Sequence, residues 1–183
     1  MKNDTFYFTN ELRQTVEDAG TSFGSLSDEQ LNWKPAADSW SVAQCLDHLI
    51  RSNGEMKPVF EAKLGGVKNT FWESWSPLTG FFGGMLKNSL RSDKKKFKAP
   101  SEAIVPPSDV PAGIVDRFAA SQEWVMAEIE KTAGLDWDKT VVTSPFMGLI
   151  TYRLRDALDI IVEHSKRHLR QAKRVTESPS FPK

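Results

Sequence analysis

The feature that most constrains the fold of this chain is a periodic stripe near its C-terminus. From residue 150 onward, apolar side chains and two histidines recur every three or four residues, which is the spacing of one face of an α-helix. The stripe consists of Ile150, Leu154, Ala157, Ile161, His164, His168, Ala172 and Val175. It predicts a core-facing helix over residues 150–175, with both histidines on its buried side.

Two earlier stretches show the same period. The first carries Phe8, Leu12, Val16, Ala19 and Phe23. The second begins after Trp40, where Ser41 and Gln44 have the S-x-x-Q spacing of a capping box. Pro58 is expected to kink or end this helix, and the pair Gly65-Gly66 to end it.

A further helix is expected before the C-terminal one. It is predicted to start near Pro111, with Ser108 or Asp109 as its N-cap, and to stop at Gly134. The only short β-like run is TVVTS at 140–144. Four amphipathic helices with so little strand signal predict an all-α protein.

The connections predict how these helices are arranged. A short first loop makes helices one and two antiparallel neighbours, whereas roughly forty residues between helices two and three are enough to cross the length of a bundle. A chain of 183 residues can bury a core of its own as one domain. We therefore expect a four-helix bundle over residues 1–176, with a long crossover and a flexible tail at 177–183.

The composition argues against several classes of partner. The 24 basic and 24 acidic residues cancel, so no global field attracts the chain to nucleic acid or to an anionic membrane. The run KKKFK at 94–98 has no accompanying nucleic-acid motif and is expected to be a solvated loop. No signal peptide or membrane span is apparent, and a single cysteine, Cys45, suits a reducing compartment. We expect a cytoplasmic protein that binds neither nucleic acid nor membrane.

The crossover is unusually aromatic. Residues 71–90 read FWESWSPLTGFFGGMLKNSL, with the aromatic and methionine side chains all within 71–86. We expect this segment to pack as a lid on the bundle end or to form a homodimer contact, in preference to lying on a membrane surface.

The histidines are the candidate site. The chain has three, and His164 and His168 are one helical turn apart, so their imidazoles lean the same way and can bind one cation. Taken alone, this pair is a weak signal, and two neutral core histidines that are hydrogen-bonded to neighbouring helices are the favoured interpretation. The third, His48, lies at the margin of the apolar face of helix two, where it can face across the bundle. The convergence of all three predicts a metal site.

Other side chains near the histidines are candidate parts of this site. Gln171 follows His164 by seven residues on nearly the same face and is a candidate to orient a ligand or a histidine. Gln44 stands one turn before His48, although its capping role explains it equally well. Trp40 is expected to seat the helix start against the core, and Cys45 to be a core residue.

Candidate general bases are scarce. The zinc-protease signature H-E-x-x-H has a glutamate that the HSKRH of this chain lacks. The carboxylates of Asp47, Asp159 and Glu163 adjoin the histidines in sequence, but a helix turns sequence neighbours about 100° apart. None of the three is therefore expected to act at the metal.

Two segments resemble a known family, the DinB-like superfamily of metal-dependent enzymes, also called DinB/YfiT-like. They are WSVAQCLDHL at 40–49 and HSKRHLRQAKRV at 164–175, and SPFMGLITYRLRDAL at 144–158 is similar to the family's approach to its last helix. The resemblance covers nearly the whole chain, except that residues 66–98 match nothing specific. It implies up-down-down-up topology and a divalent cation, often nickel or zinc, held by His48, His164 and His168. Relatives include thiol-dependent transferases and a mycothiol-dependent isomerase, and many members have no assigned reaction.

The expected chemistry follows from an open three-histidine site. Such a site leaves a coordination position for a water or thiol, which loses its proton near neutral pH. We expect a transferase or hydrolase acting on a small molecule, with nickel or zinc favoured and iron or manganese as further candidates. The alternatives are a non-catalytic metal-binding or stress-linked interaction bundle, and a bundle whose histidines bind no metal.

Overall fold

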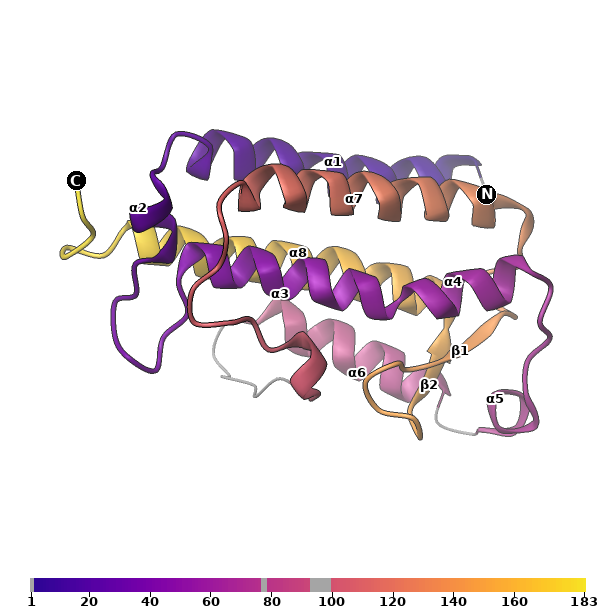
Figure 1. Cartoon of the computed structure of the whole chain (residues 1–183). Helices are drawn as coiled ribbons and strands as arrows, with labels where there is room; N and C mark the ends of the chain where they lie inside the picture. The colour runs from indigo at the N-terminus through magenta and orange to yellow at the C-terminus, as the bar shows by residue number, and fades with distance from the viewer. Residues whose placement is uncertain (1, 77–78, 93–99) are drawn as a thin grey trace.

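Four long helical segments form a bundle in the computed structural model, which describes residues 2–76, 79–92 and 100–183. They are α1 (Lys2–Phe23), α3 (Val42–Glu55) continued by α4 (Lys57–Leu64), α7 (Ile114–Lys131) and α8 (Leu154–Thr176). Figure 1 shows that α1 and α8 run in one direction, and α3 and α7 in the other. The up-down-down-up bundle is therefore confirmed.

The first two bundle helices in the chain, α1 and α3, are not neighbours. Both α1 and α3 pack extensively on α7 and on α8, which places α1 and α3 at opposite corners of the bundle. The prediction that they are neighbours is wrong because the connection between them is not a simple loop. It contains α2 (Asp28–Asn32), which has its own capping box from Ser27 and Gln30 and packs on α3, so the chain crosses the diagonal.

The second helix starts and ends where the sequence predicts. Ser41 is its N-cap, and the reciprocal hydrogen bonds with Gln44 complete the capping box. Pro58 occupies the first turn of α4, where its missing N–H costs nothing, and the helix axis is interrupted just before it. Gly65 caps the end of α4.

Helix α7 begins later than predicted. Its N-cap is Gly113, with φ of 72°, and neither Ser108 nor Asp109 caps it. This left-handed backbone conformation is open to glycine at little cost, so the turn into the helix is set by Gly113 and not by a polar side chain. At its other end, Gly134 closes a 3-10 turn, η2 (Thr132–Gly134).

The last helix is also shorter than predicted. Residues 151–153 form β2 (Thr151–Arg153), which pairs antiparallel with β1 (Val141–Thr143), so Ile150 precedes a strand and does not belong to α8. The pairing buries Val142 opposite Tyr152. The strand predicted at 140–144 is confirmed. Its partner at 151–153 was not predicted, because the helical spacing of apolar residues extends across it.

The crossover is more ordered than predicted. It contains α5 (Phe71–Trp75), α6 (Thr79–Arg91) and the 3-10 turn η1 (Glu102–Ile104). Figure 1 shows α6 returning the chain along the bundle, from the end with the β-strands to the end with α2, which is how the parallel helices α3 and α7 are joined. Much of the aromatic surface of this segment is exposed, including Phe71, Trp75 and Phe81. The basic run at 94–98 lies outside the described residues.

Salt bridges and one close approach dock α6 onto α8. Lys87 pairs with Asp159 at 2.9 Å, and Arg91 with Glu163 at 3.2 Å. The backbone of Gly83 lies so near Asp156 that a Cβ atom there would be 2.6 Å from the Asp156 Cγ. A side chain at this position would therefore push the two helices apart.

The C-terminal segment is not free of the bundle. The Phe181 ring lies edge-on to Trp33, with centroids 5.5 Å apart, and Gln30 donates a hydrogen bond to the Pro182 carbonyl. These two contacts join the end of the chain to α2 and to the residue that follows it. Within the described part of the chain, no helix combines the length and apolarity needed to cross a bilayer.

Candidate metal centre

The three histidines of the chain lie together between α3 and α8. His48 is two turns into α3, and His164 and His168 are one turn apart on α8. The ring centroids of His48 and His164 are 5.0 Å apart, and that of His168 is 4.6 Å from each of them. One ligating nitrogen from each ring falls within 4.8 Å of the other two.

A backbone carbonyl orients His48. Its Nδ1 lies 2.7 Å from the Ile104 oxygen, which can only accept a hydrogen bond, so the proton of the neutral ring is on Nδ1. The lone pair of Nε2 then faces the cluster, 3.1 Å from the Nε2 of His164. Hydrogen bonds of this kind set the tautomer and ring orientation of metal-binding histidines.

Gln44 supports this arrangement from a distance. Its side chain caps α3 and also donates a hydrogen bond of 2.9 Å to the Pro107 carbonyl. The structure therefore does not bring Gln44 to the histidines. It uses Gln44 to hold the segment that carries Ile104, which is an indirect role in positioning His48.

Trp40 forms one wall of the cluster. Its ring is 4.9 Å from that of His48 and stacks on His168 at 5.7 Å with an interplanar angle of 26°. It also packs on the apolar cluster around α3, as the sequence predicts. The same ring thus seats the start of the helix and covers two of the histidines.

Desolvation keeps all three imidazoles neutral at physiological pH, although by surface area His48 and His168 are buried and His164 is half-buried. Desolvation is the main cause of a lowered pKa at His48, opposed by the Ile104 hydrogen bond. Burial, with a smaller contribution from His48 and Arg167, lowers the pKa of His164 to about 3. The pKa of His168 is also well below 6.5, mainly through burial, and a polar interaction with the Gln171 side chain opposes this shift slightly. Neutral rings have the free lone pairs that a metal ion requires.

The carboxylates that adjoin the histidines in sequence all form ion pairs with basic side chains. Asp47 pairs with Arg51 at 2.5 Å, and Asp159 and Glu163 bind the basic residues of α6. Cys45 is fully buried, which raises the pKa of its thiol to about 12 and leaves it protonated. The described structure therefore offers no convincing protein base beside the histidines.

The donor set fits a divalent ion. Two nitrogens that each lie ~2.0–2.1 Å from a tetrahedral ion are about 3.3–3.4 Å apart, close to the 3.1 Å between the His48 and His164 nitrogens. The buried Nδ1 of His168 has no hydrogen-bond partner among the described residues. Imidazole nitrogens suit zinc, nickel, copper and iron. Gln171, close to His168, remains a candidate to orient it.

The roles of Ile104 and Pro107 could not be predicted from the sequence. Both act through backbone carbonyls, which every residue carries, so their side chains give no signal.

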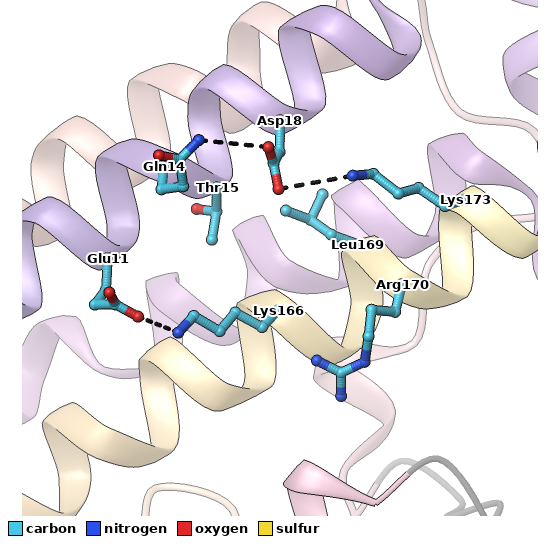
Figure 2. Close-up of a pocket in the computed structure, with 8 residues that line it drawn as sticks. All are labelled: Glu11, Gln14, Thr15, Asp18, Lys166, Leu169, Arg170 and Lys173. Carbon is cyan, nitrogen blue, oxygen red and sulfur yellow. Dashed lines mark hydrogen bonds and ion pairs between the residues drawn. The ribbon is translucent and has the colours of Figure 1, made fainter.

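A separate pocket lies between α1 and α8 and does not include the histidines (Figure 2). Its lining consists of Glu11, Gln14, Thr15, Asp18, Lys166, Leu169, Arg170 and Lys173. Ion pairs join Glu11 to Lys166 and Asp18 to Lys173 across it. These charges hold two parallel helices together and have no evident link to the histidine cluster.

The sequence and the fold of this chain are similar to those of known proteins. A solved structure described as YfiT from Bacillus subtilis, "a probable metal-dependent hydrolase with an unusual four-helix bundle topology", superposes with a TM-score of 0.60 over 97% of this chain and 88% of that one. Its sequence identity of 15% makes this a likeness of fold. The uncharacterized protein YuaE of Bacillus subtilis is 29% identical over 154 residues, or 83% of this chain and 86% of the relative. A family profile described as the DinB superfamily matches residues 11–172. The chain belongs to the DinB superfamily.

Proposed function

We propose that His48, His164 and His168 bind one divalent metal ion, and that the protein is a metal-dependent enzyme acting on a small molecule. The observation that carries the proposal is that all three imidazoles of the chain meet, neutral, at one point between α3 and α8, with His48 and His168 buried and His164 half-buried. Removing three polar rings from much of their contact with water costs free energy unless a common partner satisfies them.

The chemistry would be activation of water or of a low-molecular-weight thiol. When bound, a divalent ion supplies Lewis acidity that lowers the pKa of a coordinated water or thiol toward neutrality. The protein contributes the Ile104 carbonyl, which fixes the tautomer of His48. It also contributes the Trp40 ring, which keeps bulk water from one side of the cluster. Hydrolysis is supported by the description of YfiT, and thiol transfer by the wider family resemblance.

A non-catalytic metal-binding bundle is the second candidate. The observation that favours it is that Asp47, Asp159 and Glu163 are all engaged in ion pairs, which leaves no evident general base near the histidines among the residues that the structure describes. Only the ion itself would then supply the driving force for deprotonation. The two candidates share the same site and differ in whether a reaction follows.

Elemental analysis tests the site. Protein purified without a histidine tag should hold about one divalent ion per chain, with zinc or nickel expected, and His48→Ala, His164→Ala and His168→Ala should each lose it. Lys166→Ala is a matched control on α8, since it removes only an ion pair with Glu11. Equal metal content in the histidine variants and the control would disprove the site.

A comparison of metal-loaded and metal-free protein tests the reaction. Rates are measured for ester or amide hydrolysis, and for the attack of small thiols on electrophiles. A rate that depends on both the metal and His164 supports an enzyme. Metal binding with no rate difference across these substrates supports the non-catalytic bundle.

A further inference from the structure

Helix α5 is attached to the bundle by a carboxylate and not by apolar side chains. Glu73 is the one buried residue of this helix, and it accepts hydrogen bonds from Lys63 Nζ at 2.8 Å and from the Thr70 N–H at 2.9 Å. The Thr143 hydroxyl donates a third bond, of 3.1 Å, from β1. Lys63 is buried as well, at the end of α4. These bonds fix α5 between α4 and β1 with its acidic side turned inward.

The aromatic residues of α5 face outward. Phe71 and Trp75, one turn apart, are 81% and 71% exposed, and their rings stack at 6.3 Å with an interplanar angle of 12°. Trp72 is 42% exposed, and its indole N–H donates a hydrogen bond of 3.3 Å to the carbonyl of Leu149. Leu149 lies in the loop between β1 and β2 and is 78% exposed. These four residues form one aromatic surface over α5 and the hairpin.

The aromatic surface is large for a monomeric protein. Full burial of an aromatic side chain removes about 150–250 Å² from water, so the exposed parts of the four residues amount to roughly 500 Å². The largest apolar patch on a typical monomer covers about 300–600 Å² and is often functional. A standard interface buries about 800 Å² of each partner, and about 65% of a homodimer interface is apolar. The aromatic surface supplies that apolar share.

A cavity of about 460 Å³ adjoins α5. Its lining includes three lysines, Lys63, Lys68 and Lys139, and the apolar residues Val67 and Leu135, and no acidic residue of the described chain lines it. Lys68 is exposed and has no ion-pair partner among the residues that the structure describes. Since ammonium groups are attracted to the faces of aromatic rings, a cavity that combines lysines with apolar surface suits such a ring.

The rotation of α5 sets the aromatic surface beside this cavity. Ser74 lines the cavity, whereas Trp72 contacts the hairpin loop. Because an α-helix turns by about 100° per residue, the stacked pair of Phe71 and Trp75 lies between these two positions around the helix. A projecting pair of rings and a hollow are thus neighbours on one face of the molecule.

We propose that two copies of this chain pair about a two-fold axis through this face, with the stacked rings of Phe71 and Trp75 of each copy in the lysine-lined cavity of the other. A two-fold interface brings the same surface of both copies together, so a projecting group and a hollow beside it fill one another twice. A bilayer would cover the rings but leave the cavity unfilled. The dimer goes beyond the proposed metal function and does not depend on it.

The oligomeric state of the full chain tests the proposal. Interfaces of this size have dissociation constants of micromolar or below, so sedimentation equilibrium at micromolar concentrations should give a dimer. Phe71→Ala and Trp75→Ala should each weaken it by about 30-fold or more, as truncation of a central aromatic residue does. Both residues are exposed in the single chain, so the variants should keep the circular dichroism spectrum of the wild type.

Phe6→Ala is the matched control for the aromatic variants. Phe6 is also exposed, but it belongs to α1, which lies on the opposite side of the bundle from α5 (Figure 1). Its loss should leave the dissociation constant unchanged. A dimer that all three alanine variants leave equally stable, or a wild type that stays monomeric, would overturn the proposal. Monomeric wild type that sediments with vesicles of phosphatidylcholine and phosphatidylserine would likewise overturn it, and would identify a membrane as the partner of the aromatic surface.

The cavity is tested separately through its exposed lysine. Lys68→Ala should weaken the dimer by about 2–5-fold, the equivalent of one cation–π contact, and Lys68→Arg should retain it. Lys57→Ala removes an exposed lysine of α4 outside the cavity and should have no effect. Equal dissociation constants for Lys68→Ala and Lys57→Ala would overturn the placement of the rings in the cavity. His168→Ala should remain dimeric, so a failure of the metal site and a failure of the dimer are distinguishable.

Discussion

His48 Nδ1 donates a hydrogen bond of 2.7 Å to the carbonyl oxygen of Ile104, 56 residues further along the chain. This bond joins the candidate metal centre to the end of the long crossover. The crossover is itself fixed nearby, where Gln44 binds the Pro107 carbonyl. The orientation of His48 thus depends on how α3 holds a segment that contributes no side-chain ligand.

The first prediction concerns the way Gln44 holds the segment that carries Ile104. Gln44→Ala removes the bond that its side chain accepts from Ser41 N–H in the capping box and the bond to Pro107, so it should destabilise the fold by about 1–2 kcal/mol. Because Ile104 is then held less firmly, affinity for Zn²⁺ should also fall. Denaturant melts and metal titrations of the two proteins check this.

The matched control is Gln30→Ala. Gln30 makes the same kind of capping box, at α2, and also bonds to a distant carbonyl, that of Pro182. Its loss should reduce stability without a change in metal affinity. If both variants weaken metal binding equally, the effect comes from stability alone and Ile104 has no orienting role.

The second prediction is that the bundle does not need its histidines. The triple variant His48→Leu, His164→Leu, His168→Leu should stay helical and melt at or above the temperature of metal-free wild type, because buried polar groups are replaced by apolar area. Metal should raise the melting temperature of the wild type only. Circular dichroism with and without Zn²⁺ checks both points. A triple variant that melts far below metal-free wild type would identify the histidines as structural hydrogen-bonding residues.

The third prediction is a loss of stability in acid. The pKa of each histidine in the folded protein lies below the unfolded value of 6.5, and the pKa of His164 falls to about 3. Below pH 6.5 the unfolded chain therefore binds more protons than the native one. The histidine contribution is therefore fully present above pH 6.5 and declines toward pH 3, by on the order of 5 kcal/mol for His164.

The triple leucine variant isolates this contribution, since it retains every carboxylate. Urea melts of both proteins without metal, from pH 7 to pH 3, should show the wild type losing more stability than the variant. Parallel losses would mean that the histidines ionise in the folded state as freely as in the unfolded one. Metal binding should weaken over the same range, as protons compete for the imidazoles.

The fourth prediction concerns the docking of α6. Gly83→Ala places a Cβ atom 2.6 Å from the Asp156 side chain, so α6 should shift from α8 at a cost of about 1–3 kcal/mol. Gly84→Ala, the next residue, meets nothing within 4 Å and should stabilise the helix by about 0.5–1 kcal/mol. Opposite signs in thermal melts are expected. Equal effects of the two variants would show that α6 does not approach α8 closely at Gly83.

The predictable parts of this protein were those set by local geometry. The apolar stripe of α8, the capping box of Ser41 and Gln44, and the break at Pro58 each depend on contacts within one or two helical turns, which spacing along the chain reveals directly. The same period placed His164 and His168 on one face. The rarity of histidine then made His48 the evident third member.

Tertiary packing decided the remainder. The period of α8 continues back to Ile150, yet residues 151–153 form a strand, because pairing with Val141–Thr143 satisfies their backbone groups and buries Tyr152. The diagonal placement of α1 and α3 follows from how whole helix faces pack, and not from loop length.

The same is true of the details of the site. The Trp40 ring lies over His168, and the Ile104 carbonyl fixes His48, only because distant segments meet in the folded chain. A backbone carbonyl is identical at every residue, so no pattern of side chains marks the one that will bind His48. The sequence by itself determined which residues meet at the centre, and the folded structure decided how each of them is turned.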